Sequence, residues 1–128
     1  VTLYDPVACI GGMVHFMLSL SKTDPEKARQ KPAMFTDTGL TALIQGVLDM
    51  GAQKQRLIVK IAGAAQLMDE NGTFRIGERN LTIAQKVLWK NNMLITAAET
   101  GGTIARTVYL HMDTGRTVIR SQRQEREL

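Results

Sequence analysis

The order of strand-like and helix-like segments is the feature of this sequence that most constrains its fold. Segments rich in apolar and β-branched residues outnumber the helical ones, and the two kinds do not alternate regularly. This order predicts an α+β fold with mixed β-sheets packed against two main helices, and it argues against a doubly wound parallel sheet. The expected strands cover residues 1–4, 8–18, 56–62, 93–100, 104–112 and 116–120.

The first of the two helices has the clearest pattern in the chain. Along residues 36–50, apolar side chains recur at the spacing of a single helical face. They are Leu40, Leu43, Ile44, Val47 and Leu48. Thr36 is expected to cap the start of this helix, and Gly51 to follow its end. Asn80 is likewise expected to cap a second helix over residues 80–91.

The connecting segments are polar or carry turn residues. Residues 19–33 contain two prolines and several charges, and we expect a surface loop with a short helix over residues 25–29. Asn71 and Gly72 form a dipeptide typical of tight turns, so a hairpin is predicted within residues 66–76.

A chain of 128 residues has the length of one domain. We expect this domain to cover residues 1–120 and to be followed by a frayed, polar tail over residues 121–128. Residues 116–128 contain four arginines and two glutamates, which accounts for half of the net charge of +4. Mixed charges in the tail and an aromatic content of 5% argue against a nucleic-acid-binding surface.

The single cysteine excludes an internal disulfide bond and any zinc site built from several thiolates, and it weakly favours a reducing compartment. No apolar run approaches the ~20 residues that a membrane-spanning helix needs. The first residues, from Val1 to Tyr4, have the pattern of the middle of a strand rather than of a chain end. We therefore expect that residues are missing upstream of Val1.

His15 and Cys9 are the two residues with the most reactive side chains near the start of the chain. A histidine among apolar neighbours is more often a hydrogen-bonded core residue than a general base, and both interpretations stay open for His15. On one regular strand Cys9 and His15 would stand about 20 Å apart, at ~3.3 Å per residue. This spacing argues against a Cys–His pair, and Cys9 is expected to be a buried structural residue.

Three other features have both a structural and a functional interpretation. His111 lies before an expected hairpin, without metal-binding residues at suitable spacing, and we expect it to be structural or exposed. Gly101 and Gly102 follow a strand, where glycines either make a simple turn or present backbone N–H groups to an anion. Arg106 is expected either to orient a loop or a carboxamide, or to form an ion pair on a strand.

The chain as a whole resembles the CheD family of chemoreceptor glutamine deamidases. Each matching segment is short, but their order along the chain is specific, and together they extend to about Arg120. The segments are residues 3–8 (LYDPVA), 12–18 (GMVHFML), 35–37 (FTD), 60–65 (KIAGAA), 76–80 (IGERN) and 100–106 (TGGTIAR).

The resemblance implies an enzyme that hydrolyses glutamine side chains on methyl-accepting chemoreceptors to glutamate and ammonia, in a fold similar to that of deamidating toxins. In the family pattern His15 matches the catalytic histidine. The nucleophilic cysteine belongs to a Gly-Ser-Cys segment just before the position of Val1, and an assisting threonine lies earlier still. Cys9 falls at a variable position of the pattern, so it is not expected to be the nucleophile.

The resemblance further implies a cytoplasmic protein with a CheC-type phosphatase as partner, no metal or organic cofactor, no nucleic acid and no insertion into a membrane. Gly101, Gly102 and Arg106 are candidate substrate-binding residues. Without its nucleophile the chain as given is expected to be inactive. Two alternatives stay open: a non-catalytic module that docks a CheC-type phosphatase, and a nucleic-acid binder that uses the basic tail.

Overall fold

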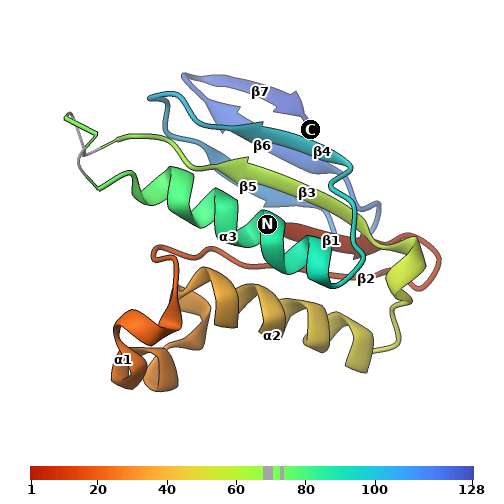
Figure 1. Ribbon diagram of the computed structural model, residues 1–128. Coiled ribbons are helices and arrows are strands. Elements are labelled where there is room, and N and C mark those ends of the chain that lie inside the picture. The colour runs from red at the N-terminus through yellow and green to blue at the C-terminus, as the bar shows by residue number, and fades with distance from the viewer. Residues whose placement is uncertain (68–70, 73) are drawn as a thin grey trace.

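The computed structural model describes residues 1–67, 71, 72 and 74–128 and contains two β-sheets. The larger sheet has the strand order β2-β1-β3-β4, in which only the β3–β4 pair is parallel (Figure 1). The smaller, antiparallel sheet has the order β5-β6-β7. The strands are β1 Thr2–Asp5, β2 Ile10–Met13, β3 Ile58–Gly63, β4 Ala97–Thr100, β5 Thr107–Leu110, β6 Thr117–Ser121 and β7 Gln124–Glu127.

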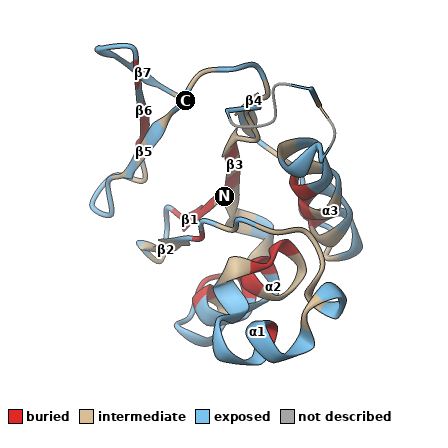
Figure 2. Ribbon diagram, turned by 90° about the vertical axis from the view of Figure 1, so that its left-hand side faces the viewer, coloured by how far each residue is buried: buried red, intermediate tan, exposed pale blue. Residues whose placement is uncertain are grey.

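The elements form three layers. Helices α2 (Thr36–Asp49) and α3 (Ile76–Lys90) lie on one side of the larger sheet, and the smaller sheet lies on its other side (Figures 1 and 2). A hydrogen bond from the Tyr4 hydroxyl to the Met112 carbonyl, 3.0 Å long, joins the two sheets. The predicted α+β class with mixed sheets and two main helices is confirmed.

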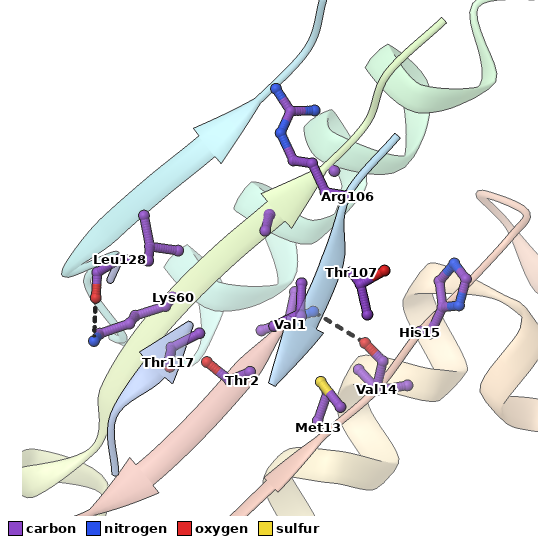
Figure 3. Close-up of a pocket in the computed structure, with 13 residues that line it drawn as sticks. Val1, Thr2, Met13, Val14, His15, Lys60, Arg106, Thr107, Thr117 and Leu128 are labelled. Atoms are coloured by element: carbon purple, nitrogen blue, oxygen red, sulfur yellow. Dashed lines mark hydrogen bonds between the residues drawn. The ribbon is translucent and has the colours of Figure 1, made fainter. Parts of the chain in front are cut away.

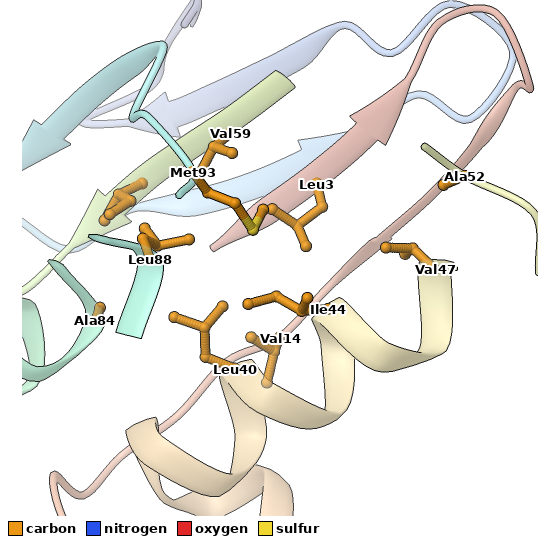
Figure 4. Close-up of a cluster of buried hydrophobic side chains, with 11 residues drawn as sticks. Leu3, Val14, Leu40, Ile44, Val47, Ala52, Val59, Ala84, Leu88 and Met93 are labelled. Carbon is orange, nitrogen blue, oxygen red and sulfur yellow. The ribbon is translucent and has the colours of Figure 1, made fainter. Parts of the chain in front are cut away.

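The main core lies between the larger sheet and the two helices (Figure 4). Leu40, Ile44 and Val47 are buried, so most of the apolar face predicted for the first helix does point into the core. The opposing side chains come from strands β1 and β3 and from α3. They are Leu3, Val59, Ile61, Ala84 and Leu88. Full burial of one large aliphatic side chain stabilises the fold by roughly 1.5–3 kcal/mol.

The loop before α2 is held by hydrogen bonds from its polar residues. It contains a short helix, α1 (Pro25–Gln30), whose first turn is capped by Asp24. Thr36 does not cap α2 as expected, because Phe35 occupies the cap position and the Thr36 hydroxyl donates to the Leu18 carbonyl at 2.9 Å. Asp37 instead accepts hydrogen bonds from the backbone and side chain of Ser21.

Several predicted boundaries are wrong. The strand expected over residues 8–18 is confined to Ile10–Met13, and its glycines mark close contacts: a Cβ on Gly11 would lie 2.6 Å from the Leu3 carbonyl oxygen. Helix α3 begins at Ile76, so Asn80 lies inside the helix and does not cap it. No strand occurs among the described residues of the hairpin expected over 66–76, part of which (68–70 and 73) lies outside the described residues.

The expected frayed tail over residues 121–128 is also wrong, since β7 pairs with β6 along its whole length. Gln122 and Arg123 both have positive φ, which is the geometry of a tight two-residue hairpin turn. All four side chains of β7 are exposed, which is why the sequence looks polar there. Among the described residues, no helix combines the length and apolar character that crossing a membrane requires.

Candidate active site

His15 lies just beyond β2, where the β1–β2 pairing reaches the start of the chain. Val1 and Val14 exchange two backbone hydrogen bonds, of 3.0 Å from Val14 to Val1 and 2.9 Å in the other direction. His15 itself is exposed, which contradicts its interpretation as a core histidine.

Three adjoining cavities share His15 as a wall. The first, of about 330 Å³, is lined by His15, Val1, Lys60, Arg106 and Thr107 among others (Figure 3). It therefore receives side chains from both sheets and from the segment after β2. Lys60 donates a hydrogen bond to the Leu128 carbonyl at the far end of this cavity.

The other two cavities lie toward α3. One has a volume of about 430 Å³ and an apolar wall that includes Met17 and Phe74, both of which are more than half exposed. The other has a volume of about 110 Å³ and joins His15 to Val1 and Asn80. His15 thus stands where the cavity bordered by both sheets meets the two cavities beside α3.

Cys9 lies at the opposite end of β2 from His15. The register pairs Ile10 with Asp5 and Met13 with Thr2. Cys9 therefore lies beside the Asp5 end of the β1–β2 pair, and His15 lies beyond the end where Thr2 is paired. The geometry agrees with the expectation that they do not form a pair. The expectation that Cys9 is buried is wrong: the residue is exposed, with a φ of 54°, and its thiol contacts the Pro6 carbonyl at 3.8 Å.

Gly101 and Gly102 form a turn that is tied to the end of β3. Both have positive φ, of 80° and 70°. The Gly101 N–H donates to the Gly63 carbonyl and the Gln66 N–H donates to the Gly102 carbonyl, each at 2.8 Å. The Gly101 N–H is therefore used inside the fold and is not directed at an anion.

Arg106 fulfils two of the roles considered for it, because it forms an ion pair and also orients a loop. Its Nε donates to Glu99 at 2.7 Å, and its Nη1 donates to the carbonyls of Gly101 and Ile104. Arg126 of β7 binds the same carboxylate. Hydrogen bonds from Arg126 and then Arg106 lower the pKa of Glu99 to about 2. The Arg106 side chain is only 8% exposed, and it borders two of the cavities beside His15.

Asp5 is a buried hydrogen-bond acceptor that could not be recognised from the sequence, in which Asp5-Pro6 indicated only a turn. Its buried carboxylate accepts hydrogen bonds from the Arg56 guanidinium and from the backbone N–H groups of Gln53, Val7 and Ala8. The Arg56 hydrogen bonds, with those from the backbone, hold the pKa of Asp5 well below its usual range. The run of turn residues after a strand was the only available signal.

The remaining candidates are not part of this site. His111 is exposed beyond β5, where its backbone N–H donates to Arg116, and it lines a separate surface cavity with residues of the smaller sheet. In the part of the chain that the structure describes, no three His, Cys, Asp or Glu side chains gather as a potential metal-binding group.

Comparisons with known proteins agree on one family. A model of the family described as "CheD chemotactic sensory transduction" matches residues 17–121, a range that begins after His15. A "Probable chemoreceptor glutamine deamidase CheD 1" from Syntrophus aciditrophicus is 44% identical over 94% of this chain and 76% of its own length. A protein with the name "Probable chemoreceptor glutamine deamidase CheD" from Solibacter usitatus is 42% identical over 99% of this chain and 75% of its own. A protein of the same name from Pyrococcus horikoshii is 39% identical over 94% of this chain and 74% of its own length.

Proposed function

Since the chain belongs to the CheD family, we propose that it acts as a chemoreceptor glutamine deamidase in which His15 transfers the protons. The substrate is the side-chain amide of a receptor glutamine, and the products are a glutamate side chain and ammonia. The names of the relatives support the reaction, and the position of His15 in the cavities supports its role.

The β1–β2 register is the observation that carries the assignment of His15. Val1 and Val14 form a hydrogen-bonded pair, and in antiparallel strands such pairs alternate with pairs whose side chains lie closer together. A residue joined to the N-terminal side of Val1 would continue β1 and stand directly opposite His15, with Cα atoms roughly 4.5 Å apart. This is where the family resemblance expects the nucleophilic cysteine.

In the proposed mechanism, His15 takes the proton of that cysteine, and the thiolate attacks the carboxamide carbon. The tetrahedral intermediate collapses as His15 returns the proton to the departing nitrogen, which leaves as ammonia. His15 then removes a proton from a water molecule that attacks the thioester. This step releases the glutamate side chain and the free cysteine.

The surroundings of His15 have supporting roles in this proposal. Arg106 borders the substrate cavity and is tied to the loop of Gly101 and Gly102, since its donors are engaged by Glu99 and by backbone carbonyls. We propose Arg106 as part of the cavity wall, with the glycine turn as its support, since Gly101 and Gly102 are not among the residues that line the three cavities beside His15. The family resemblance also supports a CheC-type phosphatase as partner and the cytoplasm as the place of action.

The test measures ammonia release from the cytoplasmic fragment of a chemoreceptor, with the natural protein including the residues that precede Val1. We expect His15→Ala to lower the rate by about 10²- to 10⁴-fold, the usual contribution of a general acid–base group. His111→Ala and Cys9→Ser are the matched controls and should leave the rate unchanged. Full activity of His15→Ala would contradict the assignment, and receptor binding without ammonia release by the wild type would favour a non-catalytic module.

A further inference from the structure

Asn80 is a buried polar residue in the site with no partner for its oxygen. The residue is 8% exposed, and its Oδ1 atom has no hydrogen-bond partner among the described residues. Buried side-chain oxygens are nearly always hydrogen-bonded, and an unpaired one destabilises the fold. An apolar residue of the same size would therefore fit this position better if packing were the only requirement.

The role expected for Asn80 from its sequence does not explain it. Helix α3 begins at Ile76, so Asn80 is in the second turn and cannot cap the helix. Water does not explain it either, because the Oδ1 atom is buried and its neighbours in the small cavity are mostly apolar. They include Val14, Phe16, Ile61, Leu81 and Ala84.

Gly77 brings the face of α3 that carries Asn80 close to the end of β3. A Cβ on Gly77 would lie 2.5 Å from the Ala64 carbonyl oxygen, so only glycine permits this approach. Residues 77 and 80 are one helical turn apart and share a face. The helix is thus held where Asn80 lines both cavities on its side of His15.

We propose that Asn80 binds the carboxamide of the substrate glutamine and distinguishes it from the carboxylate of the product. This inference rests on the proposed deamidase function. A primary amide matches another primary amide, since each offers an N–H donor and a carbonyl acceptor. Oδ1 is buried in the structure, and a rotation about the terminal torsion, whose energy minimum is broad, would turn it to the cavity without a change of χ1.

The selectivity follows from the hydrogen-bonding groups of the two side chains. Glutamine has an NH₂ group to donate to Oδ1, whereas an ionised glutamate side chain only accepts hydrogen bonds. A carboxylate can accept one hydrogen bond from the Asn80 NH₂ group, but it leaves Oδ1 without a donor and places a second acceptor beside it, so it forms one hydrogen bond where glutamine forms two. Binding of the amide and release of the product are therefore both favoured by the same side chain.

The test uses Asn80→Leu in the natural full-length protein, with the chemoreceptor cytoplasmic fragment as substrate. We expect kcat/KM for ammonia release to fall by roughly 10- to 100-fold, from the loss of two hydrogen bonds. We also expect Tm to stay the same or rise by a few degrees, because the unpaired oxygen is removed. A purely structural asparagine would instead lower Tm when it is replaced.

A second experiment measures directly how strongly the protein prefers glutamine over glutamate. In a His15→Ala background, in which turnover is expected to be about 10²- to 10⁴-fold slower, the binding of receptor fragments with glutamine is compared with that of fragments with glutamate at the modified position. We expect preference for the glutamine form to fall about tenfold when Asn80→Leu is added. Asn91→Leu, at the residue that follows the end of α3, is the matched control, because Asn91 already donates to the Val87 carbonyl. It should keep both activity and preference.

The outcomes separate this inference from the proposed function. If the wild type releases no ammonia, the deamidase assignment fails irrespective of Asn80. If the wild type is active and Asn80→Leu has normal kcat/KM, unchanged preference for glutamine, or a lower Tm, the role of Asn80 is overturned. Reduced kcat/KM with reduced preference in a protein that melts no lower than the wild type supports it.

Discussion

The two ends of the β1–β2 ribbon differ in how their polar groups are satisfied. At one end the buried carboxylate of Asp5 accepts hydrogen bonds from Arg56 and from three backbone N–H groups. At the other end His15 is exposed to three cavities, and the nearby Asn80 oxygen has no partner among the described residues. The same pair of strands thus has a closed end that stabilises it and an open end that is left available for a ligand.

The difference shows why a residue can be buried and charged without being a candidate for catalysis. Every oxygen of Asp5 is engaged by groups of the fold itself, so it has little capacity left for a substrate. His15 has the opposite arrangement, since its side chain is exposed and borders three cavities. The contrast predicts that substitutions at the closed end change stability and that those at the open end change activity.

The largest effect on stability is expected from Asp5→Ala. It leaves the Arg56 guanidinium and three N–H groups without their acceptor, and loss of one partner of a buried pair is strongly destabilising. We expect Tm to fall by on the order of 10 °C, measured by circular dichroism. His15→Ala should shift Tm by no more than about 2 °C, as for an exposed side chain.

The double variant Asp5→Ala with Arg56→Leu provides the control. Removal of both charges should recover part of the lost stability, because no unpaired guanidinium remains. If Asp5→Ala melts like the wild type while His15→Ala unfolds, the comparison between the two ends is wrong.

Acid should have the next largest effect on stability, because it weakens the ion pairs of Asp5 at the closed end and of Glu99 beside Arg106. The pKa values of Asp5 and Glu99 lie below their ordinary values near 4, that of Glu99 at about 2. A carboxyl group with a lowered pKa in the folded state stabilises the fold above its unfolded pKa, and this contribution is lost as the pH falls through the folded value. The urea midpoint should stay nearly constant from pH 7 to about 5 and drop from about pH 4.5 to 2.

Glu99→Gln sharpens this test, since it removes one of the two groups. The variant should start from a lower midpoint at pH 7 and show a shallower acid decrease than the wild type. A midpoint that rises on acidification in either protein would contradict the assigned direction of the shifts.

The smallest effect is expected from Gly77→Ala, which addresses how α3 is held beside the open end. The new methyl group would overlap the Ala64 backbone, so the start of α3 must move away. We expect Tm to fall by a few degrees and kcat/KM to fall about tenfold, since Asn80 moves with the helix.

Gly46→Ala in α2 is the matched control for this prediction. A Cβ there has nothing within 4 Å, so the change should stabilise the protein by about 0.5–1 kcal/mol through helix propensity and leave activity unchanged. If Gly77→Ala and Gly46→Ala changed Tm and kcat/KM equally, the contact between Gly77 and Ala64 would not be what positions α3.

The sequence by itself determined the α+β class, the helix over residues 36–50 and the hairpin that contains β5 and β6. All three depend on local patterns: the order of segments, a helical spacing of apolar residues and a turn between two strands. The ordered motifs also identified the family, which the comparisons confirmed.

The tertiary structure alone decided where α3 starts, that residues 124–127 form β7, and that His15 is open to cavities. Asn80 resembled a cap because caps are local signals, whereas α3 begins at Ile76, where Gly77 packs closely against the Ala64 backbone. The polar strand β7 exists through its pairing with β6 and the ion pair of Arg126 with Glu99. These contacts join residues distant along the chain, and a local pattern contains no information about which distant partner will meet it.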